Sequence, residues 1–198
     1  MSVRPLLIAL LWISPALAEG DAERGWFIAS GGIPRAGACF PCHGLAGEGD
    51  DAQAAPRLAG LSAWYLYKQM KNYTDGTRDN SIMSPIAKEM QVQDWWDIAA
   101  FYAGLNTPLP PAPPPDDNGR TIAEEKCASC HGDEGKGAPF AVPALAGQGA
   151  AYMRNQLTAW VAGRRRNDPA GAMQTITRDL SPQEAAAVSA YYEALRAD

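Results

Sequence analysis

"CFPCHG" at residues 39–44 and "CASCHG" at residues 127–132 are two copies of one six-residue phrase. Together they contain all 4 cysteines and both histidines of the 198-residue chain. Cysteines and histidines that only fill a core would also occur elsewhere in the chain. Their concentration in two short segments therefore indicates a chemical role for both segments.

The pattern Cys-x-x-Cys-His is the attachment sequence of c-type haem. Two thiols separated by two residues can both reach the porphyrin vinyl groups, and the histidine that follows lies under the iron as its proximal ligand. We therefore predict two covalently bound haem c groups, each with an iron. The residues predicted to hold them are Cys39, Cys42 and His43 in the first half, and Cys127, Cys130 and His131 in the second.

Two other uses of paired cysteines fit the sequence less well. Structural zinc sites have four protein ligands, whereas each half of this chain offers two cysteines and one histidine. A structural disulfide needs no histidine after its second cysteine. Redox-active disulfides of the thioredoxin type occur as a single motif after a strand, and here the motif occurs twice.

The similarity between the halves extends well beyond the motifs. "PRLAGLSAWYLYKQMKNYTDGTRDN" from residue 56 aligns with "PALAGQGAAYMRNQLTAWVAGRRRN" from residue 143, and "MSPIAKEMQVQDWWDIAAFYAGL" aligns with "MQTITRDLSPQEAAAVSAYYEAL". The matched pairs include Tyr65 with Tyr152, Gln69 with Gln156, Gly76 with Gly163, and Arg78 with Arg165. Self-similarity of this extent indicates a duplicated domain.

A proline-rich segment, "TPLPPAPPPDDN" at residues 107–118, separates the two copies. Such a composition favours an extended, semi-rigid linker. We therefore predict a first haem domain at residues 19–106 and a second at residues 119–198. Each domain is small for an unaided hydrophobic core, so a large apolar prosthetic group at its centre would also contribute to its stability.

The first 18 residues, "MSVRPLLIALLWISPALA", have the form of an export signal: an arginine, an apolar run and a small-residue cleavage site. The apolar run is shorter than the roughly 20 residues of a membrane span, and the alternative is an uncleaved anchor. We expect a periplasmic protein with no transmembrane segment in its mature chain. A net charge of −5 argues against a nucleic-acid partner.

Helical patterns dominate the chain, and we predict an all-α fold with almost no sheet. The clearest helix begins at Ser181, where Pro182 and Glu184 complete a capping box. Its counterpart begins at about Asp94. The other predicted helices lie at about Ser62 to Tyr73, at about Gly149 to Val161, and in short stretches near Asp21 and Asn118.

The sixth iron ligand distinguishes electron transfer from catalysis. No histidine is left, so the candidates are methionine, lysine, tyrosine or an open site. Met70, Met90 and Met153 each align with a leucine of the other half, which favours core packing. Met83 and Met173 align with each other, in stretches expected to be non-helical, and we predict that they ligate the irons. The alternative for both is loop packing.

Two pairs of residues are candidates for supporting roles. The main-chain carbonyls of Pro56 and Pro143 are suitably placed after the histidines to bind the imidazole N–H groups. Arg78 and Arg165 precede the methionine segments and are candidates for neutralising haem propionates. The alternative for both arginines is a solvated position at the surface.

These residues resemble the class I cytochromes c, and most closely the dihaem cytochrome c4 group. The resemblance rests on both attachment motifs, the Pro-x-Leu-x-Gly and Tyr-x-x-x-Gln segments and the late methionines, and it covers nearly all of the chain after residue 18. It implies two tandem helical haem domains related by an approximate twofold axis. It also implies a periplasmic carrier that transfers single electrons between redox proteins, such as a membrane oxidase of the respiratory chain or a periplasmic dehydrogenase, and that is not itself an enzyme.

The sequence leaves several alternatives open. The chain could instead be a dedicated cytochrome subunit of a periplasmic oxidoreductase complex, for example one that oxidises sulfide or an alcohol. A third hypothesis is a haem peroxidase with one open iron. The first half also carries about six extra residues ahead of Cys39, which form either a docking surface or an unselected surface loop.

Overall fold

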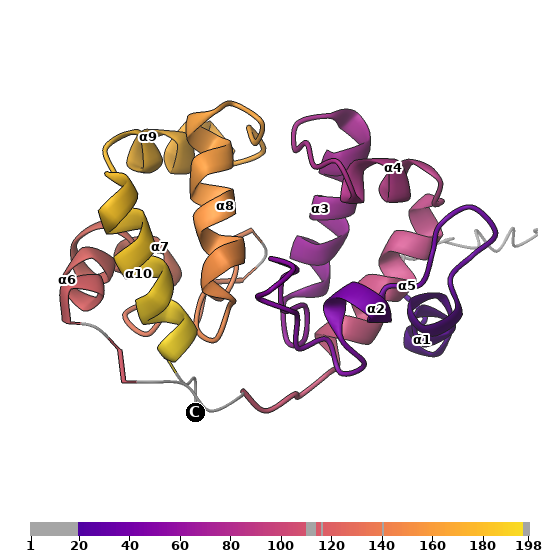
Figure 1. Ribbon diagram of the computed structural model, residues 1–198. Coiled ribbons are helices and arrows are strands. Elements are labelled where there is room, and N and C mark those ends of the chain that lie inside the picture. The colour runs from indigo at the N-terminus through magenta and orange to yellow at the C-terminus, as the bar shows by residue number, and fades with distance from the viewer. Residues whose placement is uncertain (1–19, 110–113, 116, 140, 196–198) are drawn as a thin grey trace, which may run out of the picture.

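The chain folds into two helical lobes that lie side by side (Figure 1). The computed structural model describes residues 20–109, 114–115, 117–139 and 141–195. The first lobe contains α1 (Ala22–Gly31), α2 (Phe40–His43), α3 (Ala63–Asp75), α4 (Met83–Lys88) and α5 (Val92–Ala103). The second lobe contains α6 (Asp117–Lys126), α7 (Ala128–His131), α8 (Ala150–Val161), the 3-10 turn η1 (Pro169–Gly171), α9 (Ala172–Arg178) and α10 (Pro182–Ala194). Within the described ranges only isolated β-bridges occur, which confirms the all-α prediction.

Capping boxes fix the starts of the two long helices α5 and α10. The predicted capping box is present at the start of α10, where the Ser181 hydroxyl oxygen accepts from the Glu184 N–H and the Glu184 carboxylate accepts from the Ser181 N–H. Helix α5 begins slightly before the predicted Asp94. The reason is a second capping box between Gln91 and Asp94, which places Asp94 at the third position of the helix.

The prediction that Met83 and Met173 lie in non-helical stretches is wrong. Met83 is the first residue of α4, and Met173 is the second residue of α9. In both helices a side-chain oxygen accepts from the methionine N–H: Asn80 Oδ1 at 2.9 Å for Met83 and Asp168 Oδ2 at 2.8 Å for Met173. Helices this short do not repeat an apolar position often enough to be recognised from periodicity.

Each lobe has its own hydrophobic core. The first core includes Trp95 and Tyr102 from α5, and the second includes Val188 and Tyr192 from α10. Met90 is buried in the first core and Met153 in the second, while Met70 packs against the first. These three methionines therefore occupy the core positions that the internal alignment predicts.

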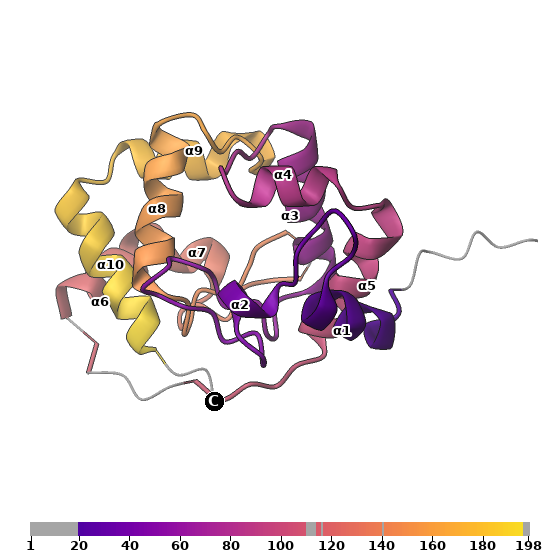
Figure 2. The ribbon, with the colours of Figure 1, turned by 45° about the vertical axis from the view of Figure 1, so that its right-hand side comes forward.

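The first helix of each lobe crosses the last helix with their backbones in contact, as α1 and α5 do in Figure 2. A Cβ atom added at Gly25 in α1 would lie only 2.1 Å from the Asp97 carbonyl oxygen. In the second lobe, a Cβ atom at Gly119 would lie 2.4 Å from the Ala187 carbonyl oxygen. Only glycine permits this approach, so both crossings depend on the residue at the contact point.

We expect Gly25→Ala to lower the free energy of unfolding by about 1–3 kcal/mol, because the added methyl group forces α1 away from α5. Gly31, in the same helix, is the matched control. A Cβ atom there would meet no atom within 4 Å, so Gly31→Ala should leave stability unchanged or raise it by up to about 1 kcal/mol. Denaturant titration followed by circular dichroism measures both variants, and equal stability for the two would contradict this account of the crossing.

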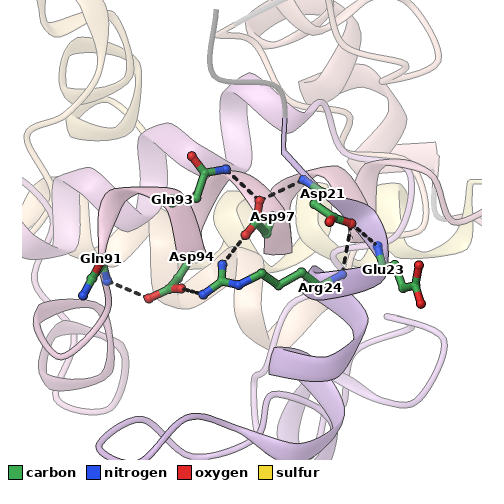
Figure 3. A network of polar contacts seen from close by, with 7 residues as sticks. All are labelled: Asp21, Glu23, Arg24, Gln91, Gln93, Asp94 and Asp97. Carbon is green, nitrogen blue, oxygen red and sulfur yellow. Dashed lines mark hydrogen bonds and ion pairs between the residues drawn. The ribbon is translucent and has the colours of Figure 1, made fainter.

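A polar network fixes the crossing in the first lobe (Figure 3). The Arg24 guanidinium forms ion pairs with Asp94 and Asp97, and Asp97 Oδ1 accepts from the Asp21 N–H and from Gln93 Nε2, each at 2.8 Å. Burial acts to raise the pKa of Asp97, but these hydrogen bonds outweigh it and lower that pKa. Asp97 therefore remains ionised although its side chain is almost completely buried.

The extra residues ahead of Cys39 fold back on themselves. Ile33 N–H donates to the Ala36 carbonyl oxygen at 2.8 Å, and Ala36 N–H donates to the Ile33 carbonyl oxygen at 3.0 Å. Ala36 is buried in the first core. The Cys39 N–H then donates to the carbonyl oxygen of Ala29 in α1 at 2.8 Å. This segment is therefore a closed turn that leads the chain from α1 to the first attachment motif.

The lobes meet along α3 and α8, which face each other at the centre of the molecule (Figure 1). The loops that follow these helices exchange backbone hydrogen bonds. Asp79 N–H donates to the Arg164 carbonyl oxygen, and Arg166 N–H donates to the Thr77 carbonyl oxygen, each at 2.7 Å. This reciprocal exchange is the one expected of two copies related by an approximate twofold axis.

Candidate haem-binding sites

Each Cys-x-x-Cys-His motif forms a short helix, α2 in the first lobe and α7 in the second. The backbone N–H of His43 donates to the Cys39 carbonyl oxygen at 2.9 Å, and that of His131 donates to the Cys127 carbonyl oxygen at 3.0 Å. This single helical turn brings the first cysteine and the histidine to the same side of the segment. The four cysteines are not joined by disulfides.

Both histidine rings are buried and held by a main-chain carbonyl. His43 Nδ1 lies 2.9 Å from the Pro56 oxygen, and His131 Nδ1 lies 2.9 Å from the Pro143 oxygen. Burial lowers the pKa of both rings, although each carbonyl acts in the opposite direction. A neutral ring whose Nδ1–H donates to a carbonyl has its Nε2 lone pair available for iron, so the two prolines have the geometry predicted for them.

The first cysteine of each motif lies against a buried tyrosine. Burial raises the pKa of Cys39 to about 11, and it also raises the pKa of Cys127, where Tyr102 and Tyr192 are the respective neighbours. Each of these cysteines is thus packed among apolar and aromatic side chains at the edge of the core of its lobe. Over the part of the chain that the structure describes, no group of three or more His, Cys, Asp or Glu side chains is placed to hold a metal ion.

A cavity of about 280 Å³ lies in the second lobe beside its attachment motif. Its walls are mainly apolar, as a porphyrin requires. The motif residues on its wall are Cys127, Cys130 and His131, and the methionines on its wall are Met153 and Met173. The cavity thus brings together the predicted ligands of the second haem, and these residues fit the group.

The cavity is completed by the other lobe. Leu61, Tyr65 and Gln69 of the first lobe contribute to its wall, together with Arg165 of the second. One edge of the second site therefore lies at the interface between the lobes rather than at the outer surface.

Arg78 and Arg165 are buried at this interface, and each residue has 4% of its surface exposed to solvent. The alternative of a solvated surface position is therefore wrong. Arg78 donates to Gln69 Oε1 of its own lobe at 2.8 Å. It also donates to the Tyr152 hydroxyl at 2.8 Å and to Gln156 Oε1 at 2.7 Å, both in the second lobe.

Arg165 makes the reciprocal set of contacts. It donates to Gln156 Oε1 of its own lobe at 2.9 Å and to the Tyr65 hydroxyl of the first lobe at 3.1 Å. Its guanidinium also lies over the Trp160 ring, 3.9 Å from the ring centroid. Burial acts to raise the pKa of Tyr65, but Arg165 and Arg78 outweigh it and lower that pKa.

Both guanidiniums have neutral partners. Among the ion pairs of the described residues, none includes Arg78 or Arg165. A buried cation is costly unless an anion compensates it. The interface therefore fits an additional anionic group beside each arginine, which a haem carboxylate would supply.

The sequence interpretation missed the interface itself, although it contained the signal. The matched polar residues of the repeat, Tyr65 with Tyr152 and Gln69 with Gln156, are the residues that bind the two arginines across the interface. Polar residues kept in both copies at helical spacing on α3 and α8 could have identified the facing surfaces.

Over residues 20–109, 114–115, 117–139 and 141–195, no helix is long and apolar enough to cross a membrane.

Two helical lobes, each with paired cysteines and a buried, carbonyl-bonded histidine, define a protein that carries two c-type haems. The family model described as cytochrome c matches residues 34–105 and again residues 117–195. The chain belongs to the cytochrome c family.

Its relatives include proteins of closely similar length. The chain is 36% identical over 200 residues to a thiosulfate dehydrogenase electron acceptor of Thiomonas intermedia, a match that covers 94% of this chain and 86% of that protein. It is 35% identical over 201 residues to cytochrome c4 of Pseudomonas aeruginosa, which covers 96% of both chains.

Solved structures show the same fold. A thiosulfate dehydrogenase (TsdBA) from Marichromatium purpuratum matches with a TM-score of 0.81 and 36% identity, over 88% of this chain and 40% of that one. Reduced recombinant cytochrome c4 from Pseudomonas stutzeri matches with a TM-score of 0.75 and 29% identity, over 89% of this chain and all of that one. The present chain is accordingly a dihaem electron-transfer cytochrome with two covalently bound haem c groups, a carrier rather than a catalytic enzyme.

Proposed function

We propose that this cytochrome accepts electrons from a periplasmic dehydrogenase that oxidises thiosulfate or a related sulfur compound, and delivers them singly to a second redox protein. The observation that carries the proposal is its similarity, at 36% and 35% identity over 94% and 93% of its length, to two proteins named as thiosulfate dehydrogenase electron acceptors. Two one-electron centres in one chain can together take up the electron pair that a dehydrogenase removes from its substrate. A carrier between respiratory proteins is the second candidate, favoured by the similarity to cytochrome c4.

We propose that Met83 and Met173 would hold the irons together with His43 and His131. Met173 lies on the wall of the cavity that also contains His131, and each methionine N–H is held by an equivalent side-chain oxygen. Haem supplies one-electron chemistry to the protein. Ligation by an imidazole and a thioether would favour the ferrous state and would leave no position for a substrate, which suits electron transfer.

We propose that Arg78 and Arg165 bind haem propionates at the interface between the lobes. Their burial without a carboxylate partner among the described residues supports this role. Each arginine is also held by side chains from both lobes, so a propionate beside it would be fixed relative to both haems. That arrangement favours rapid electron exchange within the molecule.

We further propose the organisation given by the sequence: an export signal at residues 1–18, haem domains at residues 19–106 and 119–198, and a linker at residues 107–118. The signal lies outside the described residues. Helix α6 begins at Asp117, just inside the predicted linker. Export to the periplasm would place the protein beside a periplasmic dehydrogenase.

Stopped-flow absorption of the haems tests the proposed partner. The oxidised cytochrome is mixed with a thiosulfate dehydrogenase and thiosulfate, and we expect both haems to be reduced at least tenfold faster than a single-haem class I cytochrome c under the same conditions. A mixture without the dehydrogenase is the control. Equal rates for the two cytochromes would exclude a dedicated acceptor role and favour the second candidate.

Size-exclusion chromatography of the same mixture distinguishes a subunit from a free carrier. Co-elution of cytochrome and dehydrogenase at micromolar concentration indicates a subunit of an oxidoreductase complex. Separate elution with rapid reduction indicates a carrier, because redox partners that meet transiently have small and weak interfaces.

A further inference from the structure

Gln148 of the second lobe is inserted against the first lobe beside Pro56. Its side chain is almost completely buried. The Gln148 Oε1 atom accepts from the Arg57 N–H at 2.8 Å, and its Nε2 atom donates to the Arg57 carbonyl oxygen at 3.0 Å. One amide side chain therefore binds both backbone groups of one residue in the other lobe, as a neighbouring β-strand would.

This contact is one peptide group away from the first proximal histidine. The Arg57 N–H and the Pro56 carbonyl are the two ends of the same peptide unit, and the Pro56 oxygen lies 2.9 Å from His43 Nδ1. A peptide that donates a hydrogen bond through its N–H becomes a stronger acceptor through its carbonyl oxygen, by about 10–30% per bond. The hydrogen bond that Gln148 accepts from the Arg57 N–H therefore strengthens the one that His43 donates to the Pro56 oxygen.

The second lobe lacks this connection. The internal alignment matches Gln148 with Leu61 and Arg57 with Ala144. Ala144 packs against the hydrophobic core of the first lobe, of which Leu61 is a member. A leucine side chain has no polar atom to offer the Ala144 N–H. His131 thus has the same proline carbonyl as His43, at the same distance, without the support from across the interface.

We propose that Gln148 is a positioning residue that lowers the reduction potential of the first haem by polarising the Pro56–Arg57 peptide. A stronger acceptor at Nδ1 increases the basicity of the imidazole, and a more basic ligand stabilises ferric iron relative to ferrous iron. Hydrogen bonding around the ligands is one of the means by which a protein sets a haem potential. Because Gln148 belongs to the other lobe, the effect exists only while the two lobes are docked.

The variant Gln148→Leu tests this directly, since it copies the residue of the matched position and leaves the net charge unchanged. At a fixed ambient potential, we expect the ferric-to-ferrous ratio of the first haem to fall about twofold to threefold while that of the second haem stays the same. With 59 mV for each tenfold change, this equals a rise of about 20–30 mV in the first potential. A redox titration followed by NMR measures it, because each haem is followed through the signals of its own histidine.

The reciprocal variant Leu61→Gln is the matched control. Its amide would face Ala144, beside Pro143, so we expect the second haem to become more oxidised at a given potential by a similar factor and the first to remain unchanged. Hydrogen exchange provides a readout that does not depend on the redox state. In Gln148→Leu the Arg57 amide should exchange at least tenfold faster, and the His43 ring N–H should exchange faster than that of His131.

An equal shift of both haems in Gln148→Leu would overturn the proposal, because loss of packing or entry of water at the interface acts on both sites. Faster exchange of the Arg57 amide with an unchanged first potential would also overturn it. If Gln148→Leu does not fold, Leu61→Gln alone decides by the presence or absence of its shift. These outcomes concern potentials only, whereas failure of the proposed partner would appear in the reduction kinetics and leave both potentials as expected.

Discussion

Replacing Met173 with leucine is expected to remove the thioether ligand of the second haem and to lower its reduction potential by a few tenths of a volt. Axial ligands set haem potentials over about 0.8 V, and a thioether raises the potential. Leucine preserves the volume of methionine, so packing should change little. The optical spectrum should lose the Met-to-iron charge-transfer band of one haem and keep that of the other.

The control for this replacement lies on the wall of the same cavity. Met153 is buried in the second core, and Met153→Leu should preserve both the band and the potential. In the first lobe the corresponding comparison is Met83→Leu against Met90→Leu, because Met90 is a buried core residue. If Met153→Leu removed the band and Met173→Leu kept it, the ligand assignment in the second lobe would be reversed.

Replacing Cys127 and Cys130 with serine should leave the chain with one haem and an unfolded second lobe. Without its prosthetic group, the second lobe retains a cavity of about 280 Å³. The apolar side chains that line this cavity would lose the porphyrin as their packing partner, and removing a large buried apolar group costs about 3–5 kcal/mol, which is a large part of the total stability of a typical domain. Mass spectrometry counts the haems, and circular dichroism measures the loss of helix.

The reciprocal variant, with Cys39 and Cys42 replaced by serine, should lose the first haem and keep the second. In each variant the remaining haem should keep its low-spin spectrum, because each lobe has its own core and its own histidine. A double variant that lost one haem and kept its full helical content would show that the haem does not stabilise its lobe. A variant that still carried two covalent haems would contradict the attachment sites themselves.

Features with local causes could be predicted from the sequence. The capping box at Ser181 and the contact of each motif histidine with a proline carbonyl depend on residues that are close in the chain, and the structure contains both features. Helices α4 and α9 could not be predicted, because their starts depend on single Asn or Asp side chains and their lengths give too few apolar repeats.

Contacts between the lobes could be predicted only where both copies keep them. The pair of arginines with its glutamines is repeated in the two halves, and the alignment detects it. Gln148 has no such signal, since its partner is 91 residues away and its matched residue is a leucine. A contact present in one copy alone depends on how the lobes dock, which no local pattern encodes.

The reciprocal backbone bonds between the loops after α3 and α8 have a kinetic consequence. Asp79 with Arg164 and Arg166 with Thr77 form a staple made of main chain, so its length cannot adjust by side-chain rotation. Because these bonds hold the lobes together, electron exchange between haems held by the two lobes would not require the lobes to meet first. A higher solvent viscosity should therefore lower the rate at which redox partners associate with the protein, while the rate of electron transfer within the molecule should stay the same.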